Sequence, residues 1–182
     1  MNITIFGGTK PRPGDPAYEE AERLGALLAA ADHTVITGGY MGTMEAASKG
    51  ANEAGGQVVG ITCQEIEDWR GGEANLWVTR EQKVATLQER MILLMDSADA
   101  VLALPGGVGT LAEILLLWNR MVIESSPRKP LILVGSGWQE IVKTFAAALD
   151  GYFPTNYIEM LSFAATVEEA VRLVDTFQSA RK

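Results

Sequence analysis

Short apolar runs alternate along the chain with longer segments in which apolar residues recur every three or four positions. The short runs predict buried strands, and the longer segments predict helices that bury one face. We expect strands at 3–6, 33–37, 57–62, 76–79, 99–104 and 130–134, with a short seventh strand at 157–162. We expect helices at 16–31, 43–54, 84–95, 111–122 and 138–149, and a last one opened by the capping box at 166–169.

Strands that alternate with helices predict βαβ units, which join right-handedly into a parallel sheet. The expected fold is therefore a doubly wound, Rossmann-like α/β sheet of about seven strands in three layers. Residues 1–182 are expected to form a single domain. The segment 63–75 shows no regular period and is expected to be a long loop, in which Trp69 and Arg70 form either a lid or an ordinary surface turn.

Three glycine turns follow predicted strands: Gly7-Gly8-Thr9, Gly38-Gly39 and the segment 105–110. The third turn leads directly into a helix, whose unpaired N–H groups and dipole suit a phosphate. In a doubly wound sheet such turns meet at the carboxyl ends of the strands, where ligands bind. Glycine turns also serve packing alone, so the second turn by itself leaves both interpretations open. The candidate ligand-binding residues are Gly8, Thr9, Gly38, Gly39, Met41, Gly106, Gly107, Val108, Gly109 and Thr110.

Neither common nucleotide motif is present. The first turn lacks the Gly-x-Gly-x-x-Gly dinucleotide fingerprint, and no lysine follows the glycines as in a Walker loop. A mononucleotide or another phosphorylated small molecule fits the turns better. Tyr40, Met41 and Met95 are candidates to line a base pocket, although methionines at such positions are more often core residues.

Two charged residues stand close to these turns. Arg90 lies in a helix among apolar neighbours, so its guanidinium either reaches solvent over the core or faces the pocket. Glu113 lies one helical turn beyond Thr110, where a carboxylate either benefits from the helix dipole or acts on a second part of the ligand. Spacing alone does not pair the two residues.

Composition and charge narrow the function classes. The formal net charge of −8 over 182 residues disfavours a nucleic-acid surface, and no apolar run is long enough to cross a membrane. Cys63 and His33 are the one cysteine and the one histidine, so neither an internal disulfide nor a Cys/His metal site is expected. We expect a cytoplasmic protein without a metal or other cofactor. The helix at 111–122 is apolar around most of its circumference, which predicts a homodimer through this helix.

The segment Pro105–Glu113 resembles the Pro-Gly-Gly-x-Gly-Thr-x-x-Glu signature of the LOG (Lonely Guy) family of nucleoside 5′-monophosphate phosphoribohydrolases. Several members of this family carry an older "possible lysine decarboxylase" label. Leu87–Met91 resembles the upstream Met-His-x-Arg-Lys motif of that family. The resemblance implies hydrolysis of the N-glycosidic bond of AMP or a cytokinin riboside monophosphate to free base and ribose 5-phosphate. It also implies that residues 106–110 hold the phosphate and that Arg90 and Glu113 are catalytic.

Two positions depart from the family pattern. Met91 stands where these enzymes commonly have lysine, and Gln88 stands where they commonly have histidine. Divergent relatives resemble molybdenum-cofactor carriers, which bind a phosphorylated pterin on the same sheet without catalysis. The alternative function is therefore a non-catalytic nucleotide or molybdenum-cofactor carrier. A pyridoxal-dependent decarboxylase is disfavoured, because the lysines fall mostly in loops or on polar helix faces.

Overall fold

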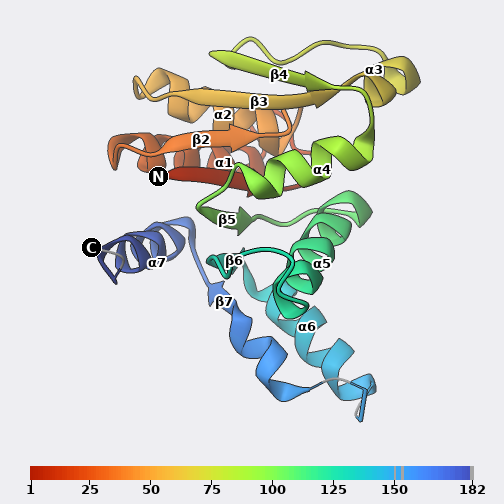
Figure 1. The fold of residues 1–182 in the computed structure, drawn as a ribbon. Helices are drawn as coiled ribbons and strands as arrows, with labels where there is room; N and C mark the ends of the chain where they lie inside the picture. The colour runs from red at the N-terminus through yellow and green to blue at the C-terminus, as the bar shows by residue number, and fades with distance from the viewer. Residues whose placement is uncertain (150, 153, 181–182) are drawn as a thin grey trace.

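The protein folds into one seven-stranded parallel sheet covered by helices on both faces (Figure 1). A computed structural model describes residues 1–149, 151–152 and 154–180. The strands are β1 (Asn2–Phe6), β2 (Thr34–Thr37), β3 (Val58–Cys63), β4 (Arg80–Val84), β5 (Ala100–Ala103), β6 (Leu131–Val134) and β7 (Leu161–Ala164). The helices are α1 (Pro16–Ala30), α2 (Thr43–Glu53), α3 (Gln64–Arg70), α4 (Leu87–Asp96), α5 (Val108–Val122), α6 (Ser136–Ala148) and α7 (Val167–Ala180), with a 3₁₀ turn, η1, at Thr155–Met160.

The order of the strands in the sheet is β4-β3-β2-β1-β5-β6-β7. The chain adds strands in one direction from β1 to β4 and then returns to place β5 on the other side of β1. Ile3 pairs with Ala100 and Phe6 with Ala103 across this central junction. The sheet is thus doubly wound as predicted, and the carboxyl ends of β1 and β5 form the switch point at which such folds bind ligands.

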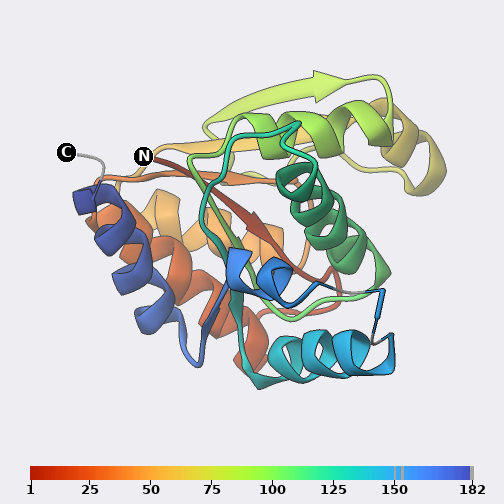
Figure 2. The same cartoon turned by 60° about the horizontal axis from the view of Figure 1, so that its bottom comes forward.

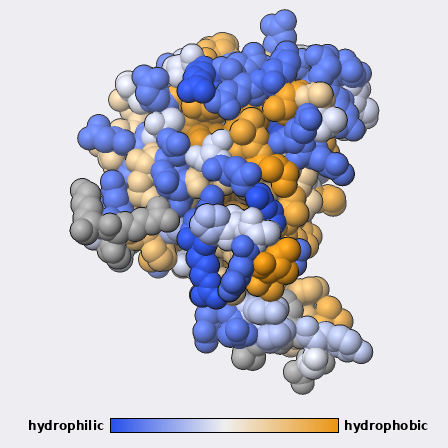
Figure 3. Space-filling view, in the orientation of Figure 1, coloured by the Kyte–Doolittle hydropathy of each residue, from blue (hydrophilic) through white to orange (hydrophobic). Residues whose placement is uncertain are grey.

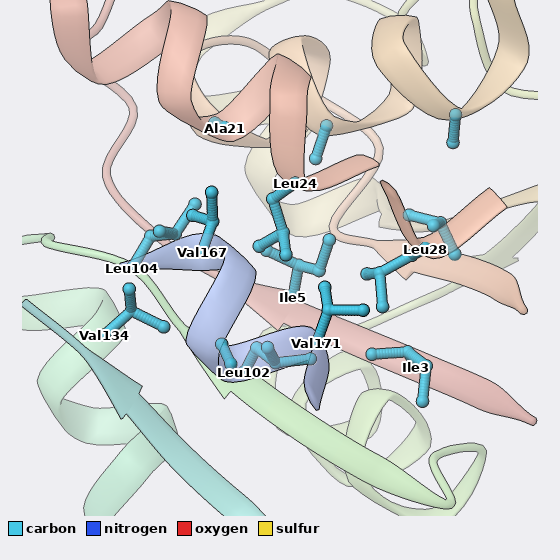
Figure 4. Packing of buried hydrophobic residues seen from close by; sticks show 14 of the residues in the cluster. Ile3, Ile5, Ala21, Leu24, Leu28, Leu102, Leu104, Val134, Val167 and Val171 are labelled. Atoms are coloured by element: carbon cyan, nitrogen blue, oxygen red, sulfur yellow. The ribbon is translucent and has the colours of Figure 1, made fainter. Parts of the chain in front are cut away.

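Alternate strand residues supply the two halves of the core. Ile3 and Ile5 face a cluster built with α1, α2 and α7, whereas Phe6 faces a cluster built with α4, α5 and α6. Figure 4 shows Leu24 of α1 and Val171 of α7 converging on Ile5 in the first cluster. Figure 2 shows α1, α2 and α7 on one side of the sheet and α4 and α5 on the other. This division into three layers confirms the predicted fold class.

Three sequence predictions of local structure were wrong. The segment expected to be a loop contains α3, a helix of 7 residues with no buried side chain. The fourth strand lies at Arg80–Val84 rather than at 76–79, so α4 begins at Leu87. The seventh strand begins at Leu161, because the residues before it form η1.

No helix among the residues that the structure describes combines the length and the apolar character that a membrane crossing requires.

Candidate functional site

A cavity of about 570 Å³ opens at the carboxyl ends of β1 and β2 and reaches the first turns of α5. Its walls come from the three glycine turns, from α4 and α5, and from the end of α3. Apolar side chains form most of the surface, including Phe6, Met44 and Leu94. The residues predicted from the sequence that line it are Gly8, Thr9, Gly38, Tyr40, Arg90, Gly107, Val108, Gly109, Thr110 and Glu113.

Four predicted residues, Gly39, Met41, Met95 and Gly106, lie outside this lining, and Met95 is fully buried in the core. Gly39 has a positive φ of 77°, and its carbonyl oxygen accepts a hydrogen bond of 2.7 Å from the backbone N–H of Asn75. The side chain of Met41 is 41% exposed and does not reach the cavity. Gly106 lies behind the lining, where any side chain would overlap the hydroxyl of Thr110.

Backbone hydrogen bonds hold the three glycine turns together. The N–H of Gly8 donates to the carbonyl oxygen of Pro105 over 3.2 Å, and the carbonyl oxygen of Gly8 accepts from the N–H of Thr43 over 2.9 Å. A side chain at Gly7 would overlap Thr43, so this close approach requires glycine there. The turn after β1 therefore joins the starts of α2 and α5 into one floor.

The two helix starts that meet this floor differ in their ability to bind an anion. At α2, the N–H of Thr43 is already bonded to Gly8, and Glu45 places a carboxylate in the first turn. At α5, no acidic residue lies in the first turn, Gly107 provides no side-chain cap, and Val108 is 86% exposed. Free N–H groups and the positive end of the dipole make the start of α5 the better site for a phosphate.

Arg90 is buried in the cavity wall, with only 5% of its surface exposed. A capping box formed by Thr86 and Glu89 starts α4 and orients the turn that carries it. Its Nε donates to the carbonyl oxygen of Ile61 over 2.7 Å, and its Nη2 donates to that of Gly38 over 2.9 Å. Within the described part of the chain, Nη1 has no hydrogen-bond acceptor. The guanidinium is thus anchored to the ends of β2 and β3 with one nitrogen left for a ligand.

Glu113 is a half-buried residue of α5 on the cavity wall. Burial raises the pKa of its carboxyl group to about 7, although the positive charge of Arg90 opposes this shift. Burial lowers the pKa of Arg90, and the Glu113 carboxylate opposes that shift in turn. No described residue forms a hydrogen bond with the Glu113 side chain. A carboxyl group of this kind changes its protonation near neutral pH and is available to a ligand.

Tyr40 forms a fixed aromatic part of the wall. Its hydroxyl donates to the carbonyl oxygen of Cys63 over 3.0 Å and accepts from the N–H of the same residue over 2.9 Å. The Cζ atom of Arg90 lies 5.4 Å from the centre of its ring.

The sequence did not identify Met44 and Ile66 as lining residues, because an apolar side chain in a pocket wall has the same local pattern as one in the core.

Comparisons with known proteins agree with this architecture. The family model described as the SLOG cluster4 family matches residues 1–149. A cytokinin riboside 5′-monophosphate phosphoribohydrolase of Mycobacterium tuberculosis is 30% identical over 98% of this chain and 90% of its own length. One of the same name from Rhodococcoides fascians is 30% identical over 69% of this chain and 65% of its own length. The molybdenum cofactor binding protein of Rippkaea orientalis superposes with a TM-score of 0.76, covering 97% of this chain and 96% of that protein at 25% identity.

Proposed function

This chain belongs to the SLOG cluster4 family, and on that premise we propose that it hydrolyses the N-glycosidic bond of a nucleoside 5′-monophosphate. The products are a free base and ribose 5-phosphate. Relatives at about 30% identity are named as phosphoribohydrolases of cytokinin riboside 5′-monophosphates, which supports the class of reaction.

The observation that carries the proposal is that Arg90 and Glu113 line one cavity beside an open helix start, close enough for the charge of Arg90 to lower the pKa of Glu113. Thr110 lies in the first turn of α5, and Glu113 follows it one turn later on the same wall of the cavity. A phosphate on the first turn of α5 places the adjoining ribose along this wall. The carboxylate then meets the ribose, which explains an acidic group next to an anion site.

The reaction breaks the bond between C1′ of the ribose and the base nitrogen. The oxygen of a water molecule bonds to C1′, one of its protons leaves this oxygen, and the departing base takes up a proton. Positive charge develops on the ribose as the base leaves, and the ionised Glu113 stabilises it from a fixed position. Arg90 supplies Nη1 to the phosphate or the ribose, while its other nitrogens hold the guanidinium in place.

The test is incubation of the protein with a panel of nucleoside 5′-monophosphates, with free base quantified by chromatography. We expect release from at least one nucleotide and a loss of at least about 100-fold in kcat for Glu113→Gln, a change that keeps the shape of the side chain. Glu140→Gln serves as the matched control, because Glu140 is exposed on α6. Unchanged activity of Glu113→Gln would overturn the site assignment, and no release from any nucleotide would overturn the reaction.

A second candidate function is a carrier that binds a phosphorylated pterin without cleaving it. The structural match to a molybdenum cofactor binding protein and the uncharged Met91 on the cavity wall favour it. Retention of a phosphorylated pterin, together with no release of base from any nucleotide, is the outcome that selects the carrier.

We also propose that the protein forms a homodimer through the outer face of α5. Leu115 is 42% exposed there and Ile123, which follows the helix, is 63% exposed. Figure 3 shows hydrophobic side chains gathered over the region of α4 and α5. Light scattering after gel filtration tests this: Leu115→Glu is expected to yield monomers, while Leu76→Glu, at a 79% exposed position before β4, is expected to retain the dimer.

A further inference from the structure

The end of α3 forms the wall of the cavity farthest from α5 along the sheet. Ile66, Trp69 and Arg70 of this helix line the cavity, although α3 follows β3 and α5 follows β5. Two strands, β2 and β1, lie between them. At about 4.8 Å per strand, the separation is roughly 14 Å. A nucleoside monophosphate with its phosphate on α5 spans such a distance with its ring directed towards α3.

Arg70 is held on this wall without a hydrogen bond or an ion pair to any residue that the structure describes. Its Cζ atom lies 4.5 Å from the centre of the Tyr40 ring, and its side chain is half-buried. The hydrogen bonds of Tyr40 with Cys63 fix that ring. A guanidinium stacked on an anchored ring keeps its plane while its N–H groups stay available.

Trp69 precedes Arg70 and offers a flat apolar surface at the same rim. Its side chain is 82% exposed even though it contributes to the cavity lining. An indole that remains this exposed adds little to the core, whereas it stacks well on a planar heterocycle. The pair therefore presents a stacking surface next to a set of hydrogen-bond donors.

We propose that Trp69 and Arg70 recognise the ring of the ligand and select rings with two adjacent acceptors. A guanidinium carries five donors and no acceptor, so it pairs with O6 and N7 of a 6-oxopurine. The amino group of adenine places a donor at the same edge and does not pair. A fully oxidised pterin offers the same two acceptors, its ring carbonyl and the neighbouring ring nitrogen. The inference deepens the proposed function, because it rests on a phosphorylated ligand that lies between α5 and α3.

Calorimetric titration of the Glu113→Gln protein tests this without turnover. We expect GMP and IMP to bind about 5- to 150-fold more tightly than AMP, the range of one good bidentate contact. Arg70→Ala is expected to remove this difference by weakening GMP and leaving AMP within about twofold. Arg70→Lys keeps the charge without the planar fork and is expected to lose most of the preference. Arg172→Ala removes one positive charge from an exposed position of α7, on the far side of the sheet, and is the matched control.

Stacking is tested separately with Trp69→Ala. This change is expected to weaken GMP and AMP by similar factors and to leave ribose 5-phosphate, which has no ring, unaffected. Titration with a phosphorylated pterin in place of GMP shows whether the protein also binds a pterin ring through its two adjacent acceptors. Binding of this pterin is expected to depend on Arg70 in the same way as binding of GMP.

Equal weakening of GMP and AMP by Arg70→Ala, or no preference between them in the parent protein, overturns the proposal. Failure of GMP, IMP and the pterin to bind overturns it as well. Base release by the wild type without an Arg70-dependent preference leaves the proposed reaction standing and removes only this inference. An Arg70-dependent preference without release of base from any nucleotide supports this inference and overturns the proposed reaction.

Discussion

Nη2 of Arg90 donates a hydrogen bond of 2.9 Å to the carbonyl oxygen of Gly38, and a side chain on Gly38 would overlap that same nitrogen. Gly38 is not among the residues with positive φ. Its lack of a side chain is therefore required by the guanidinium and not by the turn.

Gly38→Ala is expected to lower kcat/KM by about 100-fold, because displacing a catalytic group by about 1 Å has effects of this size. The measurement is the rate of base release. Gly137→Ala is the matched control, since no heavy atom lies within 4 Å of a methyl group at that position of α6. Full activity of Gly38→Ala would show that the position of Arg90 is not critical.

The pH profile of the reaction is expected to follow the ionisation of Glu113. Its pKa is raised to about 7, so the ionised form is lost as the pH falls below that value. The second-order rate constant kcat/KM should fall about tenfold per pH unit below about pH 6. A profile that stays flat from pH 5 to 8 would contradict an ionised Glu113 as the working form.

The charge of Arg90 is expected to hold the pKa of Glu113 below the value that burial alone would give. Arg90→Met removes the opposing cation and should move the titration of Glu113 to higher pH. NMR titration of glutamate carboxyl carbons follows this change even if the variant is inactive. A midpoint that moves to lower pH would show that the two groups do not interact as described.

Glu113→Gln is expected to stabilise the protein at alkaline pH. The folded pKa of about 7 exceeds the usual value of 4.5, so the folded state binds more protons between these pH values and wild-type stability falls as pH rises through this window. The glutamine of the variant does not ionise, so the stability of the variant does not fall through this pH window. We compare the free energy of unfolding of the variant with that of the wild type, measured with urea, at two pH values. The difference in favour of the variant should be about 2 to 3 kcal/mol larger at pH 8.5 than at pH 4.5. An equal difference at both pH values would contradict the raised pKa.

Met91→Lys tests whether the missing cation limits the site. Met91 is half-buried and lines the cavity, so an ammonium group there lies within reach of an anionic ligand. We expect binding of ribose 5-phosphate to tighten by about 5-fold, from an electrostatic gain of about 1 kcal/mol. Gln88→Lys adds the same charge to an exposed position of α4 and should have a smaller effect.

The sequence predicted the architecture because the central strands are buried on both faces. Their continuous apolar runs and the intervening helical periods leave few alternative folds. The prediction failed at the edge of the sheet. Arg80–Val84 is an edge strand that pairs with β3 and carries mostly exposed, charged side chains, so it lacks the apolar signal that 76–79 shows. For the same reason α3 was missed, because a helix with no buried residue has no hydrophobic period.

The lining of the cavity was predictable where residue type and backbone geometry coincide, as in the glycine turn before α5. It was not predictable where a side chain meets groups distant in the sequence. Arg90 bonds to carbonyl oxygens 29 and 52 residues away, which its helical neighbours do not reveal. The stacking of Arg70 on Tyr40 depends in the same way on how α3 lies against the end of β2.

The two hydrogen bonds of Gly8 link segments that are far apart in the chain, around residues 8, 43 and 105. Closing such long loops is slow, so the floor of the cavity forms only when β5 has docked beside β1. A phosphate bound as proposed at the start of α5 would therefore stabilise the sheet with β1 and β5 paired. Amide hydrogen exchange should accordingly slow in β1 and β5 together when a ligand binds, whereas edge strand β4 continues to open at its own rate.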